Sequence, residues 1–159
     1  MDILLSLVET NNLNLMTNET TKPPIWYWIA GIIALLWNAM GVNAYLDQAY
    51  MTPEKLATLP EAQQAMYSIE YPAWVTAAFA IAVFGGTIGS LLLLLRRNLA
   101  YIVLLFSLIG VIFQMSYAFA NNDTDSYGPG GIIMPIMIII IAIALVFLAR
   151  KAKSNNWTR

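Results

Sequence analysis

The stretch "SLLLLLRRNLAYIVLL", Ser90 to Leu105, decides how this chain folds. Two apolar runs meet at a link of two arginines and an asparagine. A membrane-spanning helix needs about 20 apolar residues to cross a hydrocarbon core of ~30 Å. The two runs extend over roughly 73–95 and 99–120, so each is long enough. The pattern predicts two transmembrane helices joined by a short basic turn.

Two further segments, 25–46 and 131–149, are also long and apolar enough to span a membrane. The four runs lack the period-two alternation of barrel strands, and a helix satisfies its own backbone in lipid. The 159 residues are 59% hydrophobic and 11% charged, which is typical of a membrane protein. We therefore expect an all-α, integral membrane bundle of four transmembrane helices over residues 25–149.

The basic residues are distributed unevenly across the expected membrane. Only Lys55 falls on one side. The other side carries Lys22, Arg96, Arg97, Arg150, Lys151, Lys153 and Arg159. By the positive-inside rule this second side is cytoplasmic, which predicts that both termini are cytoplasmic and that 150–159 is a basic tail.

Residues 1–24 precede the first expected span, and we expect them to be a disordered cytoplasmic segment. The apolar run "ILLSLV", Ile3 to Val8, is too short for a signal-peptide core and follows no basic residue. The segment is therefore not expected to be a cleaved leader. Met1 and Met16 both stay open as the initiator.

The loop 47–71 is expected to lie outside and to contain two short helices. "TPEK" at Thr52 places a capping hydroxyl before a proline, and "TLPE" at Thr58 repeats the arrangement. We expect these helices at the outer membrane interface, and a lid over a cavity is the alternative. The apolar side chains expected to face lipid or the bundle are Leu56, Leu59, Met66 and Ile69. The second outer loop, 121–131, is expected to be flexible.

Several function classes are excluded by residues that the chain lacks. It has no cysteine and no histidine, which removes thiol chemistry and the commonest metal ligand. No aspartate, glutamate, lysine, arginine or histidine lies inside an expected span, which argues against a proton-coupled pump and against acid–base catalysis in the bilayer. We expect no enzyme activity, no metal, no cofactor and no nucleic-acid partner.

The chemistry that remains in the spans is polar and uncharged. Counting ~1.5 Å per residue from the inner edge places Asn38 about 20 Å and Gln114 about 22 Å along their helices, which predicts that the two amides face each other. The polar and small faces that contain them also carry Ser107, Tyr117 and Tyr45. Amides in membranes commonly link helices. The functional alternative is a hydrogen-bonding cavity for an uncharged solute.

Small residues form a ridge along the second expected span. The ridge consists of Ala78, Ala82, Gly85, Gly86 and Gly89, and Gly41 on the first span is similar in character. Small residues let helix backbones approach closely in membranes. The ridge predicts close packing, and a contact within the chain or between chains would satisfy it equally.

Three stretches carry a resemblance to a known family: "WNAMGVNAYL", "PAWVTAAFAIAVFGGTIGSLLLLLR" and "GPGGIIMPIMIIIIAIALVFLARKAK". They resemble a family of small, uncharacterised four-helix bacterial inner-membrane proteins that are often labelled sugar transporters. The similarity extends over nearly everything from Ile25 onward. It implies a multi-pass protein of the bacterial inner membrane.

Two hypotheses about function remain. The first is a facilitator of a small neutral solute such as a sugar, acting as a homodimer because four helices scarcely enclose a path. The second is a non-transporting membrane protein that stabilises or organises a partner complex. Besides the lipid bilayer, the expected partners are therefore a second copy of the chain or another membrane protein.

Overall fold

The computed structural model describes residues 3–4, 21–121 and 131–159, and the regular secondary structure in these ranges is entirely helical. Four of its helices are long and apolar enough to cross a membrane. They are α2 (Ile25–Ala49), α5 (Ala73–Leu94), α6 (Leu99–Ala120) and α7 (Ile133–Ser154). Two short helices, α3 (Pro53–Ala57) and α4 (Glu61–Tyr67), lie between α2 and α5. The all-α, four-helix membrane architecture expected from the sequence is thereby confirmed.

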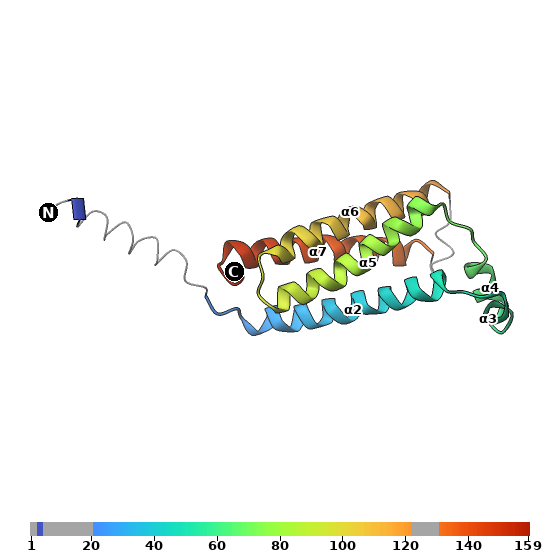
Figure 1. The fold of residues 1–159 in the computed structure, drawn as a ribbon, viewed down its shortest axis with the longest axis horizontal. Coiled ribbons are helices and arrows are strands. Elements are labelled where there is room, and N and C mark those ends of the chain that lie inside the picture. Colours follow the sequence, from blue (N-terminus) through green and yellow to red (C-terminus); the bar gives the residue numbers. More distant parts are fainter. Residues whose placement is uncertain (1–2, 5–20, 122–130) are drawn as a thin grey trace.

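The long helices pack in chain order, α2 on α5, α5 on α6 and α6 on α7, whereas α2 and α7 make little direct contact. Figure 1 shows α3 and α4 at one end of the bundle and the C terminus at the other. We call the end with the α5–α6 turn and the tail 150–159 the basic end. We call the end with α3 and α4 the loop end.

The helix boundaries differ most from the expected spans at the ends of α2 and α7. Helix α2 continues to Ala49 and α7 continues to Ser154, so half of the expected basic tail is helical. Basic side chains favour the last turn of a helix, where the carbonyl dipoles point outward, and Lys151 and Lys153 lie there. Residues 122–130 of the expected outer loop 121–131, and residues 1–2 and 5–20 of the expected disordered segment 1–24, lie outside the described residues.

Helices α5 and α6 cross at the small-residue ridge. A Cβ added to Gly110 of α6 would lie 2.8 Å from the carbonyl oxygen of Ala78 and 2.9 Å from the backbone nitrogen of Ala82. A Cβ on Gly89 of α5 would lie 2.6 Å from Cγ of Leu104. The two backbones therefore approach as closely as glycine allows.

Helix α2 packs against the same helix face of α5. A Cβ on Gly41 of α2 would lie 2.9 Å from Cγ1 of Val83, and a Cβ on Gly86 of α5 would lie 1.9 Å from Oδ1 of Asn38. Helix α5 thus packs against α2 and α6, and these small residues make their close contacts inside one chain.

The basic end is closed by the last five residues, Asn155–Arg159, which we call the clasp. The Trp157 ring packs edge-on against Trp26 and Tyr27, with centroids 5.5 and 5.7 Å apart. The backbone nitrogen of Asn98 donates to the carbonyl oxygen of Arg159 at 3.0 Å, and the Thr158 hydroxyl donates to Oδ1 of Asn98 at 2.7 Å. The tail is therefore fixed to both α2 and the α5–α6 turn.

Arg96 is the centre of the clasp's hydrogen bonds. Its Nε donates to the carbonyl oxygen of Trp157 at 2.6 Å, and its guanidinium also donates to the carbonyl oxygen of Thr21 at 2.7 Å. Arg96 and Asn156 have φ of 57° and 54°, a conformation that non-glycine residues rarely adopt. Each follows the end of a helix as the left-handed residue of a Schellman cap.

Candidate functional site

A cavity of about 640 Å³ lies in the bundle, lined by side chains of α2, α4, α5, α6 and α7. It forms because α2 and α7 make little direct contact with each other, so that the space between them is only partly filled, by side chains such as Trp37. Towards the basic end the space is filled by a core of buried side chains that includes Tyr27, Leu93 and Ala152, each 0% exposed. The cavity has the size of an ordinary small-molecule pocket.

The side of the cavity nearest the basic end carries a small polar group, the Asn38 cluster, formed by Asn38, Gly86 and Ser107. The Asn38 Nδ2 donates to the carbonyl oxygen of Ala34 at 2.8 Å, and the Ser107 hydroxyl donates to the carbonyl oxygen of Ala82 at 2.6 Å. The side-chain oxygens of Asn38 and Ser107 both lie against Gly86. A Cβ added to Gly86 would be 1.9 Å from Oδ1 of Asn38 and 3.3 Å from Oγ of Ser107. Within the described residues, no hydrogen bond reaches Oδ1 of Asn38.

In the structure, Asn38 lies beside Gly86 and Ser107, whereas the sequence predicted that it would face Gln114. Helix α2 begins beyond the α5–α6 turn, because Gly31 already contacts the side chain of Leu94 near the end of α5. Depths counted from the two helix starts are therefore not comparable. Ser107 lies at the level of Asn38, and Gln114 lies about 10 Å further towards the loop end at ~1.5 Å per residue. Both amides nevertheless line the same cavity.

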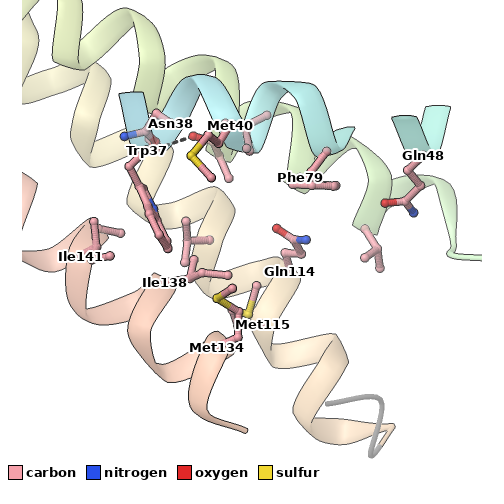
Figure 2. Close-up of a pocket in the computed structure, with 18 of the residues that line it drawn as sticks. Trp37, Asn38, Met40, Gln48, Phe79, Gln114, Met115, Met134, Ile138 and Ile141 are labelled. Atoms are coloured by element: carbon pink, nitrogen blue, oxygen red, sulfur yellow. Dashed lines mark hydrogen bonds between the residues drawn. The ribbon is translucent and has the colours of Figure 1, made fainter. Parts of the chain in front are cut away.

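The middle of the cavity is apolar. Its walls include Met40, Phe79, Met115 and Ile138. Figure 2 shows the Trp37 side chain extending from α2 towards Ile138 and Ile141 of α7, across the space between these two helices. Methionine side chains adapt to different shapes, so these walls can accommodate varied apolar groups.

The loop end of the cavity is polar and uncharged. Gln48, Gln63 and Gln114 line it from three different helices, together with Tyr67 and Tyr71. Figure 2 shows Gln48 and Gln114 well separated along α2 and α6. The described residues that line the cavity include no acidic or basic side chain.

Two charged groups at this end of the bundle, Asp47 and Lys55, pair with each other. Lys55 Nζ lies 2.9 Å from Oδ1 of Asp47, and the Asn43 amide donates to Oδ2 of the same carboxylate at 3.0 Å. The Asp47 carboxylate is therefore engaged on both oxygens outside the cavity.

Two expected site residues, Tyr45 and Tyr117, support the walls without lining the cavity. Tyr45 packs edge-on against Phe79 and Phe84, with centroids 5.5 and 5.6 Å apart. Tyr117 packs in the same way against Tyr71 and Trp74. They position neighbouring aromatic rings.

Sequence reasoning missed the side chains that make the cavity apolar, Trp37 above all. A tryptophan in the middle of a span was a usable signal, because membrane tryptophans usually lie at the interfaces. Gln48 and Gln63 gave no such signal, since glutamines near a helix end or in a loop are ordinary.

The described residues contain no group of three or more histidine, cysteine, aspartate or glutamate side chains that could hold a metal ion. No family model, curated protein or solved structure matches the chain. The assignment of function therefore depends on the cavity itself.

Proposed function

We propose that the protein binds a small uncharged molecule in this cavity and facilitates its passage across the bacterial inner membrane. The observation that carries the proposal is a cavity of about 640 Å³ whose described lining has no charged side chain. An ion in such a site would lose its hydration without gaining an opposite charge, which costs several kcal/mol or more. An uncharged molecule avoids this cost.

The orientation belongs to the same proposal. The concentration of basic residues at one end supports a cytoplasmic basic end and cytoplasmic termini, with α3 and α4 at the outer interface. The cavity then faces outward and is closed towards the cytoplasm by the clasp. Transport requires that the basic end open, and a second copy of the chain beside α2 and α7 would help to enclose the path.

One observation favours the second candidate, a non-transporting protein that organises a membrane partner. Towards the loop end, helices α2 and α7 leave a gap lined by the side chains of the cavity, and the basic end is tied by backbone and side-chain hydrogen bonds. A partner helix in the gap would cover the cavity and leave no path. Such a protein would bind without transporting.

Solute uptake into liposomes that contain only this protein distinguishes the two candidates. The panel should include sugars and other small neutral metabolites, with a charged analogue of each. The facilitator predicts protein-dependent uptake of neutral members alone. Absence of uptake for the whole panel, together with co-purification of a defined membrane partner, would replace it by the second candidate.

Replacing Asn38 by Leu sharpens this test. The change removes the amide of the Asn38 cluster, so we expect uptake to fall by about tenfold or more while the protein still inserts and folds. Asn43→Leu is the matched control, because Asn43 lies on the same helix but donates to Asp47 outside the cavity. Equal uptake by the two variants would show that Asn38 does not contribute to the site.

A further inference from the structure

We infer that the preferred ligand of the cavity is an uncharged amphiphile, with an apolar body beside α6 and α7 and a hydrogen-bonding head towards the loop end. This inference depends on the proposed binding function and names its ligand class. A compact polar solute such as a free sugar is the competing class.

The polar side chains of the cavity lie towards its two ends, and this distribution favours an amphiphile over a free sugar. Its middle section, between the Asn38 cluster and Gln114, is walled by Met40, Phe79, Val111 and Met115. A free sugar held there would lose hydrogen bonds to water, and each hydroxyl left unpaired would weaken its binding. An alkyl or isoprenoid body would instead bury its apolar surface favourably against these walls.

The polar loop end is the second argument. Amides of Gln48 and Gln63 and the phenol of Tyr67 come from α2 and α4 and line one end of the cavity. Amides both donate and accept, so they suit hydroxyl or amide groups on a ligand. The described residues that line this end offer no charged side chain to a charged head group, and Asp47 and Lys55 pair with each other at 2.9 Å outside the lining. The head is therefore expected to be neutral.

The gap between α2 and α7 is the third argument. These two helices make little direct contact, and the Trp37 side chain occupies the space between them beside Ile138 and Ile141 (Figure 2). All four long helices are those expected to cross the membrane, so the gap faces the apolar phase of the bilayer. A membrane-dissolved amphiphile can reach the cavity by displacing Trp37, a route closed to a solute confined to water.

The test uses the full chain in phosphatidylcholine vesicles and three matched probes: glycerol monodecanoate, decanoate and glycerol. The first has the apolar body and a neutral head, the second has the same body with a charged head, and the third has the head alone. Because the chain has no cysteine, a single Ser107→Cys substitution gives one thiol in the cavity, whose labelling by N-ethylmaleimide reports occupancy. Met115→Cys is a second position on the same cavity, in case Ser107→Cys does not fold.

Saturating glycerol monodecanoate is expected to slow labelling by about tenfold or more, and the other two probes by less than about twofold. Ser116→Cys, exposed on the same helix and outside the cavity lining, controls for effects on the bilayer and should show no dependence on the probe. If glycerol protected as well as glycerol monodecanoate, the inference that the ligand has an apolar body would be wrong. If decanoate protected equally well, the inference that its head is neutral would be wrong. If the cavity thiols react and none of the probes protects them, the ligand class is wrong while the cavity stands. If neither cavity thiol reacts at all, both the ligand class and the proposed binding function are wrong.

Discussion

The two ends of the bundle are built in opposite ways. At the basic end, Tyr27, Leu93 and Ala152 are 0% exposed, and the tail is tied to α2 and to the α5–α6 turn by rings and hydrogen bonds. At the loop end, α2 and α7 leave a cavity of about 640 Å³. Figure 1 shows that the same helices run through both ends.

This difference indicates where stability and function reside. A dense core and the hydrogen bonds of the clasp stabilise the basic end, whereas a cavity forfeits dispersion contacts on every wall. The loop end is therefore expected to tolerate changes in side-chain volume that the basic end does not. A ligand that fills the cavity would stabilise the fold by mass action.

The largest contrast is expected from truncating one apolar side chain at each end. Leu93→Ala creates a new cavity in the closed core, so the free energy of unfolding should fall by about 3–4 kcal/mol. Ile138→Ala only enlarges an existing cavity, so the expected loss is about 1 kcal/mol. Reversible unfolding in mixed micelles measures both. Equal losses would contradict the contrast between the ends.

Removing the clasp's ring comes next. Trp157→Ala loses the packing against Trp26 and Tyr27, and we expect a loss of about 2–3 kcal/mol in the free energy of unfolding. The matched control at the loop end is Trp74→Ala. Trp74 is 50% exposed and packs on Tyr117, so a loss of about 1 kcal/mol is expected there. A larger loss for Trp74→Ala would reverse the assignment of the stable end.

The smallest effect concerns α3 at the loop end. The pKa of Glu54 is lowered because its own backbone N–H donates to the carboxylate, and the Thr52 hydroxyl adds a second hydrogen bond. A lowered pKa in the folded state means that this contribution to stability is present above the unfolded pKa and lost as pH falls through the folded pKa.

Thr52→Ala should therefore raise the pKa of Glu54 towards its ordinary value, as followed by the carboxyl carbon shift in an NMR titration. Thr58→Ala is the control, because the Thr58 hydroxyl donates to the carbonyl oxygen of Lys55 and to nothing on Glu54. A pKa of Glu54 that is identical in the Thr52 variant and the unchanged chain would remove Thr52 as a cause.

The four spans were predictable from sequence because length and apolar composition suffice to define them. The end of α7 was not, since Lys151 and Lys153 mark the edge of the apolar run without ending the helix. The clasp was also beyond prediction. It depends on Arg96 and Asn156 in left-handed conformations, and a sequence signals such a cap mainly when glycine occupies the position.

The candidate site was predicted in part. Asn38, Ser107 and Gln114 all line the cavity, because polar residues deep in a span need a polar environment. Their mutual arrangement could not be predicted, since it depends on the offset of α2 along the bundle. The contact between Gly31 and Leu94 fixes that offset, and it is a property of three-dimensional packing.

The most direct test of the account compares the reactivity of two buried serine positions after substitution by cysteine. Ser107 is 5% exposed and lines the cavity, whereas Ser90 is 0% exposed and does not. In vesicles without added ligand, N-ethylmaleimide should label Ser107→Cys faster than Ser90→Cys by about tenfold or more, because only the cavity admits the reagent. Equal labelling rates, or faster labelling of Ser90→Cys, would contradict a bundle that is open at the loop end and closed at the basic end.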